Sequence, residues 1–448
     1  FTHKDDQSIH PKTPELLHQI ADKIEENGID AWFDADAEEF LGDEASSYQK
    51  SSDTMDVWMD SGIAHQTVSH LFEHITNDAD LYLEGSDQHR GWFQSSLLTS
   101  VAINNQAPYK EVLTHGFVVD EKGHKMSKSL GNTVSPQSVI NNMGADILRL
   151  WVASTDYTSE MKISDQILKR NADTYRRIRN TARFLLSNLS DFDPKKDQQK
   201  VDELVLLDQL AVKRIALLNE QIMNEYNSYS FHKIIQLLHN FCVNDMGGFY
   251  LDILKDRLYT MPLDSAGRRS AQTALYLISE SLTRWIAPIL SFTAEEIWKH
   301  MPERKEESVF LSEWLELTKT ESCTDWDRLN EINTVALKAL EVARDDGQIG
   351  SPLDAHLIIS AGKDTHDFLS QFSEELRFLF ITSSVDLRLD DNNESNDEVR
   401  VEVNKSNDEK CGRCRHRQQT VGDSAEHPEI CGRCISNITD SPEERSFF

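Results

Sequence analysis

The sequence predicts a multidomain protein with an α/β part first, then a helical bundle, a small α/β appendage and a metal-binding module. Three observations predict this order. Two short apolar runs flank a probable helix before residue 120, a helical period of apolar residues fills much of residues 164–330, and four cysteines form two Cys-x-x-Cys pairs after residue 410. The length of 448 residues also exceeds the roughly 250 to 300 residues that one hydrophobic core usually supports.

The composition predicts a globular protein that does not enter membranes. Apolar residues make up 39% of the chain and charged residues 27%. No run of about 18 apolar residues is present, and the first residues lack the pattern of a secretory signal, so we expect a cytoplasmic protein. The formal net charge of −30 opposes nonspecific attraction to nucleic acid, so an RNA partner would require a local cluster of positive charge.

The first 163 residues are expected to form the α/β part. Residues 81–83 predict a strand that ends at Glu84, a helix follows, and residues 113–119 predict a second strand. Strand, helix and strand in this order predict two parallel strands, and ligands of such sheets bind beyond the carboxyl ends of the strands. The acids Glu84 and Asp87 therefore lie where a ligand is expected.

The remainder of the chain divides by periodicity and composition. Leu168, Ile178 and Leu185 recur on one face of a long helix and predict the start of a helical domain. A later stretch rich in Asp, Asn, Glu and Ser predicts an exposed linker. The assigned ranges are 1–163 for the α/β part, 164–330 for the helical domain, 331–390 for a small α/β junction domain, 391–410 for the polar linker and 411–448 for the metal-binding module.

Four cysteines near the end have the spacing of a zinc site. Two Cys-Gly-Arg-Cys turns each offer two thiolates, and four soft ligands close a tetrahedral structural site that leaves no position for catalysis. Two redox pairs or two disulfides are the alternative, which this spacing favours less. We expect one zinc ion per chain, bound by Cys411, Cys414, Cys431 and Cys434.

The most specific motif is Lys125-Met126-Ser127-Lys128-Ser129, which resembles the ATP-binding loop of class I aminoacyl-tRNA synthetases. The resemblance makes Lys125 and Lys128 candidate catalytic residues and Met126, Ser127, Lys128 and Ser129 candidate ATP-binding residues. Attack of a carboxylate on the α-phosphate builds negative charge on phosphate oxygens, which ammonium groups on a mobile loop can stabilise. We expect Lys128 to make the main transition-state contact. A solvated basic loop is the alternative.

Residues 83–93 resemble the adenylate-binding segment of the isoleucine, valine and leucine branch of this class. The resemblance places Glu84, Gly85, Asp87 and Gln88 against the ribose and amino-acid portions of the aminoacyl-adenylate. Carboxylates accept hydrogen bonds from hydroxyl and ammonium groups, and glycine permits close approach of the backbone. Taken alone, Glu84 would be assigned as a capping or surface acid.

Two tryptophans become candidates for the amino-acid pocket. Residues 56–62 resemble another segment of the same branch, although Phe is more familiar at the position of Met59. The resemblance implies that Trp58 and Trp92 form walls for a branched aliphatic side chain. Rigid apolar walls favour a longer side chain by about 1 to 3 kcal/mol per methylene. Packing in the core is the alternative for each tryptophan.

A basic stripe and the cysteine module are the candidate contacts with RNA. Arg176, Arg177, Arg179 and Arg183 lie opposite the apolar face of their helix and could bind phosphates, or they could pair with acids of neighbouring helices. The cysteine module resembles the C-terminal zinc domain of bacterial isoleucyl enzymes, which contacts the anticodon region of tRNA. Arg415 stands where many relatives have an aromatic residue.

Together these resemblances imply the C-terminal part of a class I Rossmann-like catalytic domain followed by a helical anticodon-binding domain. The implied reaction is activation of L-isoleucine by ATP, accompanied by Mg²⁺, and transfer to isoleucine tRNA by a monomer without a membrane partner. A valyl or leucyl relative and a noncatalytic tRNA-binding fragment are the alternatives. No His-x-Gly-His motif or editing domain is present, and the chain starts with Phe1, so we expect a fragment without a complete active site.

Overall fold

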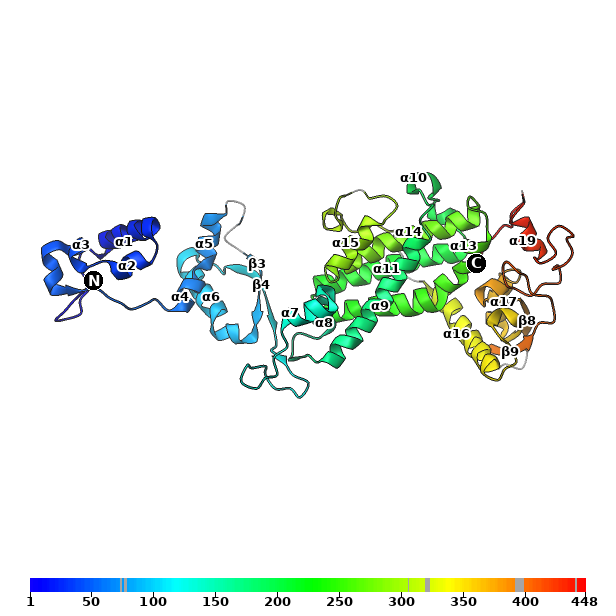
Figure 1. Cartoon of the computed structure of the whole chain (residues 1–448), viewed down its shortest axis with the longest axis horizontal. Helices are drawn as coiled ribbons and strands as arrows, with labels where there is room; N and C mark the ends of the chain where they lie inside the picture. The colour runs from blue at the N-terminus through cyan, green and yellow to red at the C-terminus, as the bar shows by residue number, and fades with distance from the viewer. Residues whose placement is uncertain (73–74, 76–78, 305, 319–322, 391–398, 440) are drawn as a thin grey trace. The chain divides into compact units, whose positions relative to one another are not determined.

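The computed structural model describes residues 1–72, 75, 79–304, 306–318, 323–390, 399–439 and 441–448. Packing divides the chain into two compact units, Phe1–Gly116 and Phe117–Phe448 (Figure 1). This division falls inside the range predicted as the α/β part, which we expected to end at residue 163. The adenylate-like segment therefore belongs to the first unit, and the lysine loop belongs to the second.

The first unit contains a parallel pair of strands, as predicted, but the second strand ends at His115 and not at Val119, because Val118–Val119 form a separate strand of the second unit. β3 (Ala79–Gly85) pairs in parallel with β4 (Tyr109–His115), and α6 (Trp92–Asn104) connects them. The buried Tyr82 and Phe93 pack between this pair and the helix. The other elements are β1 (Thr2–His3), α1 (Thr13–Asn27), α2 (Asp30–Asp34), α3 (Ala37–Leu41), β2 (Tyr48–Gln49), α4 (Val57–Gly62), α5 (Ala64–Leu71) and the 3-10 helices Gly42–Ser47 and Ser86–Arg90.

The second unit begins with a short parallel pair that frames the lysine loop. β5 (Val118–Val119) pairs with β6 (Met161–Lys162), and α7 (Pro136–Met143) and α8 (Ala145–Ser154) lie between them in sequence. Asp146 of α8 is buried and accepts the backbone N–H of Thr293 at 2.8 Å. This hydrogen bond fixes the segment after the loop to the helical bundle.

A helical bundle follows, as the periodicity predicts. It begins with α9 (Asp165–Ser187), where the Ser164 hydroxyl caps the helix by accepting the N–H of Ile167. α14 (Ala266–Ile286) is buried along nearly its whole length and packs against α9 and α11 (Figure 1). The other helices are α10 (Pro194–Asp197), α11 (Leu206–Asn227), α12 (Phe231–Asn240), the π-helix Phe241–Tyr250, α13 (Leu251–Thr260), α15 (Ser291–Lys299), α16 (Thr324–Asp345) and the 3-10 helices Val201–Glu203 and Val309–Leu311.

A buried ion pair sets the position of α13 against α11. Arg257 donates two hydrogen bonds of 2.7 Å to Asp208, and both side chains are almost fully enclosed. The hydroxyls of Tyr250 and Ser270 also donate to Asp208. Removing one partner of such a pair typically costs about 3 to 5 kcal/mol because the other charge is left buried. The pair therefore holds α13 in one orientation.

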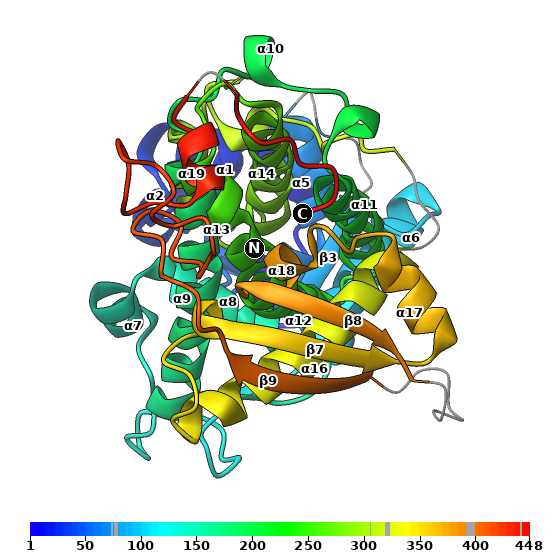
Figure 2. The same cartoon turned by 90° about the vertical axis from the view of Figure 1, so that its right-hand side faces the viewer.

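The junction domain is a three-stranded sheet in the order β8, β7, β9 (Figure 2). β7 (Ala355–Ala361) pairs in parallel with β8 (Ser384–Leu389) and antiparallel with β9 (Val399–Lys405). Alternate residues of β7 are buried, as expected for a strand with one face in the core. The associated helices are the 3-10 helix Pro352–Asp354, α17 (Lys363–Ser370) and α18 (Leu376–Leu379), while α16 packs against β9.

Two predictions about this region require correction. The prediction of an exposed linker over residues 391–410 is wrong for β9, because Val399, Val401 and Val403 alternate with polar residues and extend the sheet. Residues 391–398 of that range lie outside the described residues. The predicted boundary between residues 330 and 331 falls inside the continuous helix α16, so the helical part extends further than predicted.

The last part of the second unit consists mainly of turns around the four cysteines. Its single regular helix among the described residues is the short α19 (Gly432–Ser436). Because so few backbone groups pair within regular elements here, other interactions must hold this part in place. Within the described ranges of both units, no helix combines the length and apolar composition required to cross a bilayer.

Candidate functional site

The adenylate-like segment forms a tight turn at the carboxyl end of β3. A Cβ atom on Gly85 would lie 2.6 Å from a carboxylate oxygen of Asp87, so a larger residue here would displace the Asp87 side chain. Gln88 donates to Asp87 at 3.2 Å and accepts the backbone N–H of Trp92 at 3.1 Å. Glu84 is exposed at the end of the strand. The structure thus brings the four predicted residues into one turn at the sheet edge.

The two candidate tryptophans also come together. The ring of Trp92 stacks on Tyr82 with centroids 4.3 Å apart, and its Nε1 donates to the carbonyl of Ser61 at 2.8 Å. Trp58 approaches Gly91 so closely that a Cβ atom there would lie 3.0 Å from its ring. Trp58 nevertheless remains 46% exposed. Trp92 therefore serves packing as well, while Trp58 offers a free apolar face.

The lysine loop is bounded by two turns that favour glycine. Gly123 has φ of 84° and Gly131 has φ of 65°, and both lie in the left-handed region where side chains are strained. The Gly131 N–H donates to the Lys128 carbonyl at 3.3 Å. Lys128 and Ser129 are exposed at this second turn, and Met126 packs against the small core that includes Trp151. The loop therefore presents Lys128 outward.

Two further residues hold this loop, and the motif did not indicate them. Asp120 accepts the backbone N–H groups of Lys122 and His124 at 3.0 and 2.9 Å and the side-chain amide of Asn132 at 2.9 Å. Asn132 in turn accepts the N–H of Ser127 at 3.0 Å. The hydrogen bond from Asn132 and those from the backbone lower the pKa of Asp120 to about 2. An Asp three residues before a glycine is a turn signal that could have suggested this role.

The four cysteines form a compact buried cluster. Their sulfur atoms all lie within 4.8 Å of one another, and two Sγ–Sγ distances are 3.7 Å. Four sulfurs at about 2.3 Å from one zinc ion would be separated by roughly 3.8 Å in a tetrahedron. The described cysteines form no disulfide, so all four thiols can serve as ligands. The cluster fits zinc, and its members are Cys411, Cys414, Cys431 and Cys434.

The predicted basic stripe is exposed on α9. Arg176 pairs with Asp173 of the same helix, and not with an acid of a neighbouring helix. Across the described part of the chain, no acid lies within 4.0 Å of Arg177, Arg179 or Arg183 to form an ion pair. Arg179 and Arg183 line a groove of about 1150 Å³ between α9, α15 and the segment of α7 and α8. Three of the four arginines are thus available to a partner.

Comparison with known families accounts for successive parts of the chain. The family described as tRNA synthetases class I (I, L, M and V) matches residues 1–164, and the anticodon-binding domain of tRNA ligase matches residues 208–359. The zinc finger found in FPG and IleRS matches residues 408–437. The chain belongs to the class I aminoacyl-tRNA synthetases, and the predictions of fold class and zinc are confirmed.

Within this class, curated relatives that are about half identical to the chain are isoleucine-tRNA ligases, and the predicted resemblance is confirmed. The chain is 52% identical to those of Teredinibacter turnerae and Saccharophagus degradans, in matches that cover 100% of this chain and 49% of each relative. It therefore spans about half the length of the curated relatives it matches. A solved LeuRS-tRNA-LeuAMS complex from Agrobacterium radiobacter aligns with a TM-score of 0.49 and 19% identity, over 61% of this chain and 35% of that one. The assignment rests on the sequence relatives.

Proposed function

We propose that the full-length protein activates L-isoleucine with ATP and transfers it to isoleucine tRNA. This chain would supply the lysine loop, the adenylate-binding turn and the tRNA-contacting parts. The observation that carries the proposal is Lys128, which stands exposed on a loop held by Asp120 and Asn132 in a chain 52% identical to isoleucine-tRNA ligases. The same relatives argue against valine or leucine as the substrate.

The chemistry requires orientation and charge stabilisation. The isoleucine carboxylate attacks the α-phosphorus of ATP, the bond to the bridging oxygen breaks, and its electrons leave with pyrophosphate. The Lys128 ammonium offsets the charge that develops on the phosphate oxygens. Glu84, Asp87 and Gln88 would orient the ribose and ammonium groups through hydrogen bonds. Mg²⁺ bound with ATP supplies further positive charge to the phosphates.

The second unit offers surfaces for tRNA. Arg177, Arg179 and Arg183 would bind phosphates, which positions the RNA without reading its sequence. The zinc module would approach the anticodon region, where Arg415 is the exposed arginine beside the ligands. A chain with a net charge of −30 repels RNA on average, but the local cluster of arginines on α9 would still attract phosphates. We expect the protein to act as a cytoplasmic monomer.

Pyrophosphate exchange tests this proposal. The full-length protein should exchange labelled pyrophosphate into ATP with isoleucine, and far less with valine or leucine. One methylene separates isoleucine from valine, so discrimination of about 10- to 200-fold is expected at this step. Exchange with leucine or valine but not with isoleucine would overturn the substrate assignment.

A further inference from the structure

The two Cys-x-x-Cys turns share a feature that zinc binding leaves unexplained. Each has the sequence Cys-Gly-Arg-Cys, with Arg413 in the first turn and Arg433 in the second. Neither arginine is a metal ligand. The Arg433 side chain is only 11% exposed, and a guanidinium so deeply enclosed requires an acceptor nearby.

Both arginines contact the same helix of the bundle. Arg433 donates from Nη1 and Nη2 to the two oxygens of Asp256 at 2.6 and 2.9 Å. Arg413 donates from Nη1 to the carbonyl of Thr260 at 2.6 Å, at the end of α13 where carbonyls lack helical partners. Asp256 and Thr260 are one helical turn apart. The two arginines therefore contact α13 at positions that are one helical turn apart.

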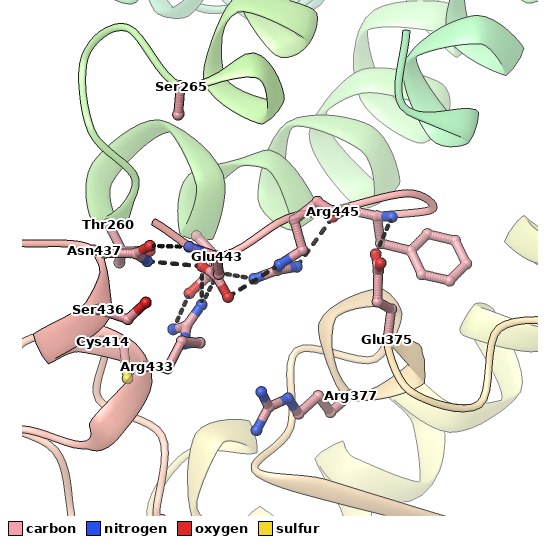
Figure 3. Close-up of polar contacts among 12 residues, drawn as sticks. Thr260, Ser265, Glu375, Arg377, Cys414, Arg433, Ser436, Asn437, Glu443 and Arg445 are labelled. Carbon is pink, nitrogen blue, oxygen red and sulfur yellow. Dashed lines mark hydrogen bonds and ion pairs between the residues drawn. The ribbon is translucent and has the colours of Figure 1, made fainter. Parts of the chain in front are cut away.

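The closing segment, residues 441–448, binds to the same aspartate. Arg445 donates to Asp256 at 2.7 Å, and Glu443 lies within 3.1 Å of Arg433 and 3.3 Å of Arg445 (Figure 3). Burial opposes the ionisation of Asp256, but Arg433 and Arg445 hold its pKa well below the ordinary value. Asp256 and Glu443 therefore offset the charges of Arg433 and Arg445.

The closing segment continues from this cluster into the bundle core. Glu375 accepts the backbone N–H groups of Ser446, Phe447 and Phe448 at 2.9, 3.1 and 2.8 Å. The carbonyls of Ser446 and Phe447 accept the first N–H groups of α11. Phe448 is 1% exposed. Docking of this segment is therefore part of the packing of the bundle.

We propose that zinc holds Arg413 and Arg433 in the positions at which they bind α13, and that Asp256 of this helix binds Arg445 at the same time. Zinc occupancy and docking of the closing segment then stabilise each other. The coupling arises because the ligands fix the turns on which the arginines stand, so the metal pre-organises both guanidinium groups. Coupling of this kind is reciprocal, so loss of the contacts that Arg413 and Arg433 make with α13 must also weaken the binding of zinc.

The test compares Asp256→Asn with Asp252→Asn in the zinc-loaded chain. Asp252 is the matched control because it lies one turn earlier on α13 and, among the residues that the structure describes, pairs only with the exposed Lys255. For Asp256→Asn we expect zinc release to a chelator and amide hydrogen exchange of residues 441–448 each to be about tenfold faster than in the control. Removing zinc from the unaltered chain should also speed exchange in residues 441–448, which contain no ligand.

Several outcomes would overturn the coupling. Asp256→Asn could match the control in both measurements, or exchange could rise without faster release of zinc, or zinc removal could leave residues 441–448 protected. Should Asp256→Asn fail to fold, Arg433→Lys keeps the charge, loses the two-pronged contact and should shift both measurements in the same direction. These measurements do not depend on the proposed reaction. A raised KM for tRNA with unchanged pyrophosphate exchange is a consequence that does rest on the proposed function.

Discussion

Lys125 and Lys128 have different surroundings, although the motif presents them as a pair. The Lys125 ammonium lies 4.0 Å from the centre of the Phe117 ring, and its backbone bridges to Val119. A cation–π contact at an exposed site contributes about 0.5 to 1 kcal/mol, which is enough to bias the side chain toward the ring. Lys128 has the exposure required to reach a bound triphosphate. We therefore assign the phosphate contact to Lys128.

Replacing Lys128 by alanine should slow isoleucine-dependent pyrophosphate exchange by about 100- to 1000-fold, the usual cost of removing one donor to a developing negative charge. Binding of tRNA should be unchanged. Lys122→Ala is the control, since Lys122 is an exposed lysine in the preceding turn. An equal loss in both variants would contradict a specific role for Lys128.

The pH dependence of the loop provides a second test at this scale. Asp120 has a pKa of about 2, below its ordinary value of 3.8, so its contribution to loop order is complete above about pH 4 and lost as pH falls through about 2. The N–H resonances of Lys122 and His124 should shift in that window. The Asp120→Asn variant should show no such shift. A transition near pH 4 in the unaltered chain would mean that these hydrogen bonds do not hold the carboxylate.

The motif predicts which residues of the loop contact ATP, but it does not predict which residues fix the conformation of the loop. The identity of Lys128 follows from a local pattern. The hydrogen bond between Asp120 and Asn132 joins residues at the two ends of the loop, so it appears only once the chain has turned back. Likewise, Trp92 was predicted as a pocket wall, but its stacking on Tyr82 depends on how β3 meets α6.

At the level of elements, α9 separates its two faces as the periodicity predicted. Leu168, Ile178 and Leu185 are buried, and the arginines are exposed on the other side. Whether those arginines meet acids depends on neighbouring helices, which a single-helix pattern does not contain. The strand β9 was missed for a different reason: it follows a stretch rich in Asp, Asn and Glu, and the alternation of its valines with polar residues was overlooked.

The arginines of α9 should contribute to tRNA binding through phosphates. Arg179→Ala combined with Arg183→Ala should raise the KM for tRNA by about tenfold and reduce the log–log salt slope of binding by up to about 2, one for each lost contact. Pyrophosphate exchange should not change. Arg176→Ala is the control, because Arg176 already pairs with Asp173. An unchanged salt slope in the double variant would exclude phosphate contacts here.

For the whole chain, the candidate sites are distributed over the two compact units. The turn that we propose to bind the adenylate lies in one unit, and the lysine loop, basic stripe and zinc cluster lie in the other. Motifs predicted the order of these parts along the chain. The boundary at Gly116 could not be predicted, because it depends on which long-range contacts each segment makes.

Loss of zinc should therefore affect the two steps of the reaction unequally. Cys411→Ser in the full-length protein should weaken tRNA charging by about tenfold or more and leave adenylate formation nearly unchanged, since the ligand lies outside the catalytic segments. Cys323→Ser is the control, because Cys323 is buried in the bundle and lies outside the cluster. Equal losses in charging and in pyrophosphate exchange would contradict this division.

The π-helix Phe241–Tyr250 determines the direction in which α13 faces. A Cβ atom on Gly247 would lie 3.2 Å from the carbonyl oxygen of Cys242, five residues earlier, so the small residue suits the wider winding. An α-helix advances about 100° per residue, so a slip of one residue in this winding would put Arg257 where Asp256 now stands. A cation would then meet Arg433 and Arg445. The winding of the π-helix thus decides whether the arginines of the zinc module meet an acid or a base on α13.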